Sequence, residues 1–190
     1  MLPHSRSYHI VKLSEAAYNL PLPKTKVLAH IAGPSGSGKT ELANRLSAVA
    51  HNIHFVDLDE FDDEAVSSLG WTHVPKNDYT DEMLHKLFVL RQKRITNFIK
   101  QSYLPIVFFG HHIEAGYVTK IPTSVRILLN VSPRSATIRR AKRFDYSKER
   151  VQQDIEVGKE DVRFLRAHGY ILMSPRQVYS IIMRWSQELG

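Results

Sequence analysis

The amino-acid sequence predicts an α/β protein, a three-layer α/β/α domain built on a parallel β-sheet. Five short apolar runs suited to buried strands alternate with longer segments in which apolar residues recur at helical spacing. Strands that alternate with helices imply right-handed crossovers and a parallel sheet that is covered on both faces. Ligands of such domains gather at the carboxyl ends of the strands, so we expect the functional site there.

The positions of the strands and helices follow from these patterns. The expected strands lie at residues 27–32, 53–58, 105–110, 125–131 and 170–173. The expected helices lie at residues 41–49, 80–101, 132–144, 147–167 and 174–188, and two of them open with a Ser-Pro pair that joins an N-cap to proline at the first helical position. Residues between the second strand and residue 80 are expected to form a loop. Residues 1–26 are interpreted as an N-terminal extension and residues 27–190 as one domain.

The composition limits the classes of protein to which the chain can belong. Its 190 residues suit a single core, and the absence of cysteine excludes disulfides, thiol catalysis and cysteine-ligated zinc. The longest apolar runs, such as residues 106–109, are far too short to cross a bilayer, and the first residues lack the apolar core of a secretory signal. We therefore expect a cytoplasmic protein with access to ATP or GTP and no membrane partner.

The most specific motif is G-x-x-x-x-G-K-[ST], which residues 33–40 match at every fixed position. An apolar run precedes it and a helical pattern follows it, which is the strand–loop–helix context of a phosphate-binding P-loop. Backbone N–H groups of such a loop surround a phosphate, Lys39 reaches the terminal phosphates and is predicted to be a catalytic residue, and the Thr40 hydroxyl ligates Mg²⁺. The predicted nucleotide-binding residues are Gly33, Ser35, Gly36, Ser37, Gly38, Lys39, Thr40 and Glu41.

Acidic residues gather where the second strand is expected to end. Six acids and no base occur from Asp57 to Glu64. On an extended chain Asp57 and Asp59 point to the same side, so both can face the Mg²⁺ and the acceptor. Asp57 is predicted to join Thr40 at the metal, and Asp59 to orient an acceptor hydroxyl and accept its proton as a catalytic residue. A solvated strand end is the alternative interpretation, and which of the two carboxylates binds the metal stays open.

Basic residues gather after the fourth expected strand. Residues 133–150 contain seven Lys and Arg residues but only two acidic residues, so this short segment carries most of the net charge of +7 of the whole chain. Such a cluster is typical of a nucleic-acid surface, a phosphate clamp or a solvated helix face. The P-loop favours the clamp, with Arg139 and Arg143 closing on the phosphoryl group as catalytic residues and Arg139 also contacting the nucleotide.

These features together resemble the P-loop kinases of small metabolites and nucleotides. That group includes nucleoside and nucleoside monophosphate kinases, shikimate- and gluconate-type kinases, and uridine or nicotinamide riboside kinases. The resemblance rests on the P-loop, on the Asp-x-Asp of Asp57-Leu58-Asp59, on Asp59-Glu60-Phe61, which is similar to the Asp-x-Phe of the uridine and riboside kinases, and on Arg139, Arg140 and Arg143. It implies the P-loop NTPase fold with a five-stranded parallel sheet of order 2-3-1-4-5 and a short arginine-bearing lid.

The resemblance also implies roles for single residues, and the sequence departs from it at one point. In such kinases the acid that matches Asp59 contacts the acceptor hydroxyl, and arginines placed like Arg139 and Arg143 stack near the base and neutralise the transferred phosphoryl group. The third strand ends in Gly110 rather than in the acid that often helps to hold Mg²⁺. This departure disfavours a mechanical ATPase, and a glycine there resembles the shikimate-type kinases, where it lines the acceptor pocket.

Other residues invite weaker hypotheses. His111 and His112 could line the acceptor pocket, bind a metal or simply pack. Trp71, Tyr79 and Phe61 could form an aromatic wall for a planar acceptor, although aromatic residues beside a loop more often belong to the core.

The function that the sequence favours is an ATP-dependent phosphotransferase acting on a small acceptor, with Mg²⁺ and with GTP as a further donor candidate. The acceptor would be a nucleoside, a nucleotide or another small hydroxyl metabolite. Two alternatives stay open: a kinase of nucleic-acid 5′-hydroxyls, which would give the chain a nucleic-acid partner, and a nucleotide-binding regulatory module without catalysis.

Overall fold

A five-stranded, all-parallel sheet forms the middle layer of the molecule. The computed structural model describes residues 20–75, 78–110, 113–114, 117–118, 121–123 and 125–190. The strands lie in the order β2 (His54–Asp57), β3 (Ile106–Phe109), β1 (Val27–Ala32), β6 (Val125–Leu129) and β7 (Ile171–Met173). Since β6 and β7 are the fourth and fifth strands of this sheet, the predicted fold class and the order 2-3-1-4-5 are confirmed.

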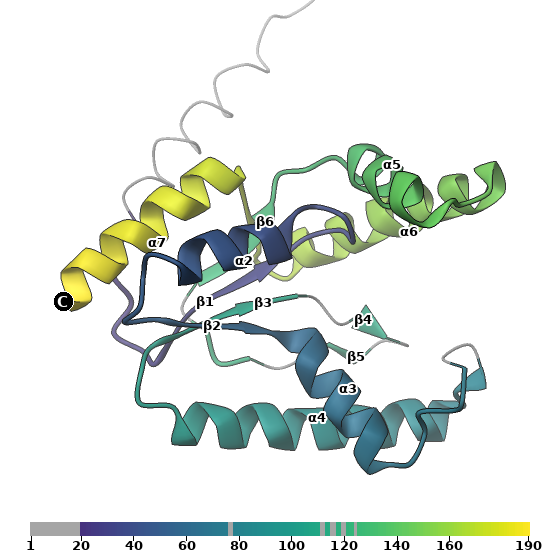
Figure 1. Cartoon of the computed structure of the whole chain (residues 1–190), viewed down its shortest axis with the longest axis horizontal. Helices are drawn as coiled ribbons and strands as arrows, with labels where there is room; N and C mark the ends of the chain where they lie inside the picture. The colour runs from purple at the N-terminus through teal and green to yellow at the C-terminus, as the bar shows by residue number, and fades with distance from the viewer. Residues whose placement is uncertain (1–19, 76–77, 111–112, 115–116, 119–120, 124) are drawn as a thin grey trace, which may run out of the picture.

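Helices cover both faces of the sheet (Figure 1). Helices α2 (Lys39–Ser47) and α7 (Pro175–Leu189) pack on one face through a core that includes Leu46, Phe109 and Trp185. Helices α3 (Leu58–Ser68) and α4 (Asp81–Gln101) pack on the other face around Phe108. Because neighbouring residues of a strand point to opposite faces, Phe108 packs in one of these two cores and Phe109 in the other.

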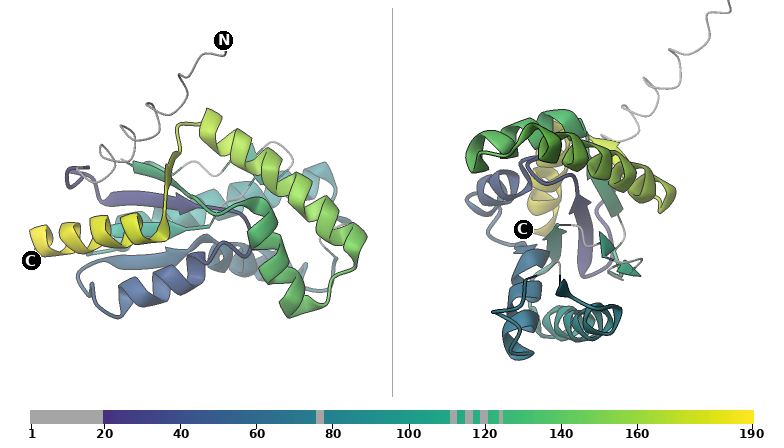
Figure 2. Two further views of the ribbon diagram at one scale, coloured as in Figure 1. Left: turned by 90° about the horizontal axis from the view of Figure 1, so that it is seen from above. Right: turned by 90° about the vertical axis from the view of Figure 1, so that its right-hand side faces the viewer.

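Helices α5 (Pro133–Phe144) and α6 (Lys148–Ala167) follow β6 in the chain, precede β7 and pack against each other. Figure 2 shows them together at the end of the molecule away from the C-terminus. Ser132 and Ser147 cap their N-termini by accepting hydrogen bonds from the N–H groups of Ser135 and Arg150. The strands β1 and β3 point toward this end, so the helix pair stands over the carboxyl edge of the sheet (Figure 1).

The predicted loop after the second strand is wrong over residues 59–68, which form helix α3 together with Leu58, the last residue of the predicted strand. Asp57 caps this helix, because its side chain accepts a hydrogen bond from the Asp59 N–H at 3.1 Å. Leu58, Phe61 and Ala65 recur at helical spacing and are buried. Most acids of the segment occupy the first turn and the exposed face, where the helix dipole and water favour negative charge, whereas Asp62 is buried and pairs with Arg91. The acidic segment that was expected to end a strand therefore forms an amphipathic helix with an acidic first turn.

The aromatic wall suggested for a planar acceptor is wrong for Phe61. Its ring is buried and packs edge-on against Phe98 and Phe108, so it belongs to the core. Trp71 and Tyr79 do contact each other, with ring centroids 5.7 Å apart. The short antiparallel pair β4 (Ile113–Glu114) and β5 (Tyr117–Val118) is a further element that the sequence did not predict.

The described start of the chain is attached to the last helix. Leu20 and Leu22 pack against the core, and the Leu20 carbonyl accepts hydrogen bonds from Arg184 and from the Trp185 indole, the latter at 3.2 Å. Residues 1–19 of the predicted N-terminal extension lie outside the described residues. No helix in the described ranges has the length and apolar character that crossing a membrane requires.

Candidate functional site

The P-loop connects β1 to α2 and aims the helix N-terminus at open space. Gly36 and Gly38 have φ angles of 83° and 89°, a region that glycine enters without strain. The Ser37 N–H donates to the Pro34 carbonyl at 3.0 Å and closes the turn. The Leu42 N–H bonds to the Gly38 carbonyl, so the N–H groups of residues 39–41 precede the helical ladder. These donors and the helix dipole together make an anion-binding site.

A cavity of about 440 Å³ opens in front of this loop. Its lining brings together ten of the predicted site residues, namely Ser35, Gly36, Gly38, Lys39, Thr40, Glu41, Asp57, Asp59, Arg139 and Arg143. Arg140, which the resemblance includes in its arginine set, and Phe144, which the sequence prediction did not name, also line it. Segments that lie about a hundred residues apart in the sequence therefore meet at one concave surface.

Gly33 and Ser37 are predicted nucleotide-binding residues that do not line the cavity. The Ser37 side chain is only 2% exposed, and within the described part of the chain its hydroxyl has no hydrogen-bond partner. A Cβ atom on Gly33 would lie 2.8 Å from that hydroxyl oxygen. Gly33 thus makes room for a side chain packed beneath the loop.

Lys39 is a half-buried cation at the floor of the site. Its Nζ donates to the carbonyl oxygens of Gly33 at 2.7 Å and Pro34 at 3.2 Å. Burial lowers the pKa of Lys39 below its ordinary 10.5, while the negative charges of Asp59, Asp57 and Asp161 raise it in part. A poorly solvated ammonium interacts with an incoming phosphate more strongly than one surrounded by water.

Asp57 and Asp59 both reach the cavity, but not by the predicted route. The sequence prediction places both on an extended chain, whereas β2 ends at Asp57 and Asp59 lies in the first turn of α3. The Asp57 side chain folds back as the helix cap, and this turn brings the two carboxylates to one side. Crowding also affects their neighbour, since burial, Asp57 and Glu64 raise the pKa of Glu60.

The donor set of the cavity fits a magnesium ion carried by a nucleotide. Thr40 and Asp57 offer a hydroxyl and a carboxylate oxygen at the same cavity. Mg²⁺ prefers oxygen ligands and is usually held by one or two protein groups together with substrate phosphates. Within the described ranges no group of three or more His, Asp or Glu side chains is arranged as a metal cage. The cavity therefore fits a magnesium ion that is shared between the protein and the phosphates of a nucleotide, and not one that is held by protein ligands alone.

Helix α5 forms the cationic wall opposite the carboxylates. It lies directly on the P-loop, because a Cβ atom on Gly36 would stand 2.4 Å from the Ala136 carbonyl oxygen. Arg140 is held back by Asp154, at 3.4 Å between Nη1 and Oδ2. In the described structure Arg139 and Arg143 carry no such ion pair and are exposed. Two guanidinium groups thus face the cavity with their charge available to a ligand.

The end of the third strand is fixed by a chain of buried polar groups. Gly110 has a φ of 113°, and a Cβ atom there would stand 3.1 Å from the Leu58 Cβ. Its carbonyl oxygen lies 2.6 Å from His30 Nε2, and the Tyr170 hydroxyl lies 2.6 Å from His30 Nδ1. A carbonyl can only accept, so Nε2 carries the proton; in the neutral imidazole Nδ1 then accepts a hydrogen bond from the Tyr170 hydroxyl. Burial correspondingly raises the pKa of Tyr170 to about 12.

Gly110 is therefore seated against the junction of β2 and α3 and is absent from the lining of the P-loop cavity. The structure shows a packing role for this glycine, and its predicted role in an acceptor pocket stays a prediction. His111 and His112, for which the sequence left several roles open, lie outside the described residues.

Known proteins share this fold at low sequence identity. A shikimate kinase from Bacteroides thetaiotaomicron aligns with a TM-score of 0.55 and 19% identity over 86% of this chain and 98% of its own. A shikimate kinase from Acinetobacter baumannii, solved in complex with shikimate, aligns with a TM-score of 0.52 and 16% identity over 92% of this chain and 97% of its own. A gluconokinase from Sinorhizobium meliloti 1021 reaches a TM-score of 0.43, which is too low to support an argument.

No family model matches the chain, and no curated protein matches it in sequence. The predicted resemblance to small-molecule P-loop kinases is confirmed for the fold, whose five-stranded order the shikimate kinases share.

Proposed function

We propose that the protein is a kinase that transfers the γ-phosphoryl group of ATP to a small acceptor. One observation carries the proposal: the P-loop, two carboxylates and the arginines of α5 line the same cavity. Phosphoryl transfer needs a phosphate-binding loop, a positioned acceptor and cations around the migrating group. The fold shared with shikimate kinases supports this reaction class, since those proteins are named as kinases of a small hydroxylated acid.

Each wall of the cavity has a part in the proposed reaction. Lys39 and the N–H groups at the start of α2 bind the donor phosphates, and Thr40 with Asp57 would hold Mg²⁺, which neutralises charge on those phosphates. Asp59 orients the acceptor hydroxyl and accepts its proton. Arg139 and Arg143 stabilise the negative charge of the transferred group.

The acceptor is proposed only as a class: a nucleoside, a nucleotide or another small metabolite with a hydroxyl group. ATP is the proposed donor, and GTP stays a further candidate. Transfer to nucleic-acid 5′-hydroxyls is not favoured by any contact in the described cavity. That alternative predicts binding that weakens steeply with salt, because strand binding releases counterions, whereas a small acceptor responds little.

Transfer from labelled ATP to a panel of nucleosides, nucleotides, sugars and hydroxy acids tests the proposal. Asp59→Asn should abolish transfer while ATP binding persists, because the carboxylate acts on the acceptor. Asp63→Asn is the matched control, since Asp63 lies on the same helix, is exposed and does not line the cavity. Full transfer by Asp59→Asn would overturn the assignment of Asp59. ATP binding without transfer to any acceptor would favour the regulatory module.

A further inference from the structure

We infer that Phe144 is the platform on which the nucleobase of the donor stacks, an assignment that rests on the proposed function. Phe144 is the last residue of α5 and lines the cavity together with the P-loop. Its side chain is 58% exposed. Among the described residues that line the cavity, only Phe144 has a large apolar side chain.

The surroundings of Phe144 hold its ring at the edge of the cavity. Asp145 has a φ of 51° and ends α5, so the chain turns back on itself at this point. The rings of Phe144 and Tyr146 are stacked as a result, with centroids 6.1 Å apart and planes inclined by 24°. The guanidinium groups of Arg150 and Arg140 lie 4.6 Å and 5.4 Å from the centre of the Tyr146 ring. Cations over an aromatic face stabilise its position.

The chemistry of the cavity matches the two ends of a nucleoside triphosphate. Its P-loop end offers N–H groups and Lys39 to an anionic phosphate chain. Its α5 end offers arginines and one exposed aromatic face. An aromatic side chain stacks on any base, because every base presents a π-face. Adenine and guanine share that face, so Phe144 should hold ATP and GTP alike and should contribute nothing to a ligand without a base.

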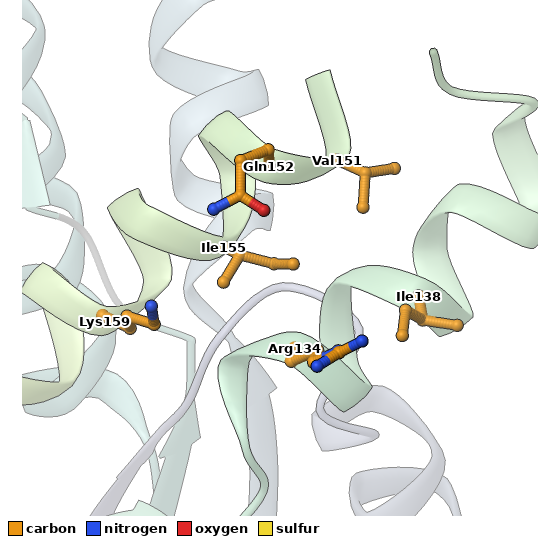
Figure 3. A pocket seen from close by; sticks show the side chains of 6 residues that line it. All are labelled: Arg134, Ile138, Val151, Gln152, Ile155 and Lys159. Carbon is orange, nitrogen blue, oxygen red and sulfur yellow. The ribbon is translucent and has the colours of Figure 1, made fainter. Parts of the chain in front are cut away.

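The opposite side of α5 provides a control within the same helix. A second groove, of about 530 Å³, lies between α5 and α6 and is lined by Ile138, Val151 and Ile155 with three polar residues (Figure 3). Ile138 is 39% exposed and points into this groove, not into the P-loop cavity. Replacing Ile138 removes exposed apolar surface from α5 without touching the proposed base platform.

Calorimetric titration with ATP, GTP and inorganic tripolyphosphate, all with Mg²⁺, tests the assignment. Phe144→Ala should weaken ATP and GTP binding by roughly 10-fold each, the loss expected for one aromatic–base stack, and should leave tripolyphosphate binding unchanged. Phe144→Trp should retain the affinity for ATP. Ile138→Ala should bind all three ligands like the wild-type protein.

Two results would overturn the assignment. Equal loss of ATP and tripolyphosphate affinity in Phe144→Ala would mean that the ring only supports α5. Unchanged ATP affinity in that variant would mean that the base lies elsewhere. Either result leaves the proposed function intact if the wild-type protein binds both ligands. A wild-type protein that binds neither would instead overturn the proposed function, and this assignment with it.

Discussion

Replacing Gly36 by alanine would press a methyl group into the backbone of helix α5. The new Cβ atom would stand 2.4 Å from the Ala136 carbonyl oxygen, well inside the 3.0 Å that real Cβ atoms respect. That oxygen belongs to a helix backbone and cannot swing aside. Gly38 provides the matched control, because its φ of 89° is close to the 83° of Gly36 and nothing lies within 4 Å of its hypothetical Cβ.

The two variants share one cost and differ in another. Holding an alanine at positive φ costs about 1–2 kcal/mol at either position. Gly36→Ala adds the cost of forcing an atom into packed structure, about 1–3 kcal/mol. For a chain of this size each kcal/mol lowers the melting temperature by about 2–4 °C. Gly36→Ala should therefore melt several degrees below Gly38→Ala.

Thermal and urea unfolding of the ligand-free proteins measures this difference. Ligand must be absent, because Gly38 faces the cavity and an added methyl group there could also meet a bound phosphate. Equal destabilisation of the two variants would refute the reasoning, since it would mean that the P-loop does not rest on α5. The cationic wall would then not be anchored next to the phosphate site.

Three further predictions concern ionisable groups that are buried or half-buried. Arg91→Met should destabilise the fold by about 3–5 kcal/mol in urea unfolding, because it breaks a 2.9 Å ion pair with Asp62 whose side chains are only 1% and 5% exposed; Arg94→Met, which breaks an exposed pair, should cost under about 1 kcal/mol. Tripolyphosphate affinity should fall as the pH rises, with a midpoint below 10.5, because the lowered pKa of Lys39 makes it lose its charge early; a flat profile up to pH 10.5 would contradict this. Stability should fall between pH 10 and 12 more steeply in the wild-type protein than in Tyr170→Phe, by at most about 3 kcal/mol in total. The buried phenol keeps its proton to a pKa of about 12, whereas the unfolded chain loses it near 10, so the contribution is complete below pH 10 and is lost above it; parallel curves would contradict this.

The parts of the fold that the sequence predicts well are those with strong local signals. The apolar run of β1, the glycines of the P-loop and the periodicity of α2 each act over a few residues, and the five-strand parallel order followed from the resemblance. Helix α3 was missed because its acids are as typical of a solvated strand end as of a capped first turn. Only the burial of Leu58, Phe61 and Ala65 separates the two, and burial depends on α4 and β3.

Residue types in the sequence predict most residues of the site, but tertiary contacts decide how these residues come together. Asp57 and Asp59 were placed at the cavity for a reason that is wrong, since a helix cap and not strand alternation brings them together. Phe144 directly follows Arg143 inside the basic cluster of residues 133–150, and an aromatic side chain among these cations is the signal that the sequence offers for it. No local pattern separates the arginine that pairs with Asp154 from its neighbours on α5, because that contact comes from α6.

The fate of the γ-phosphoryl group tests the central claim most directly. Phosphorus NMR of the wild-type protein with Mg²⁺-ATP and the acceptor panel follows donor, inorganic phosphate and any phosphorylated acceptor in one spectrum. The proposed function predicts a new phosphate resonance with one acceptor, growing as the γ-phosphate signal declines, and its loss in Lys39→Ala. Consumption of ATP to inorganic phosphate alone, at the same rate with and without every acceptor, would contradict it.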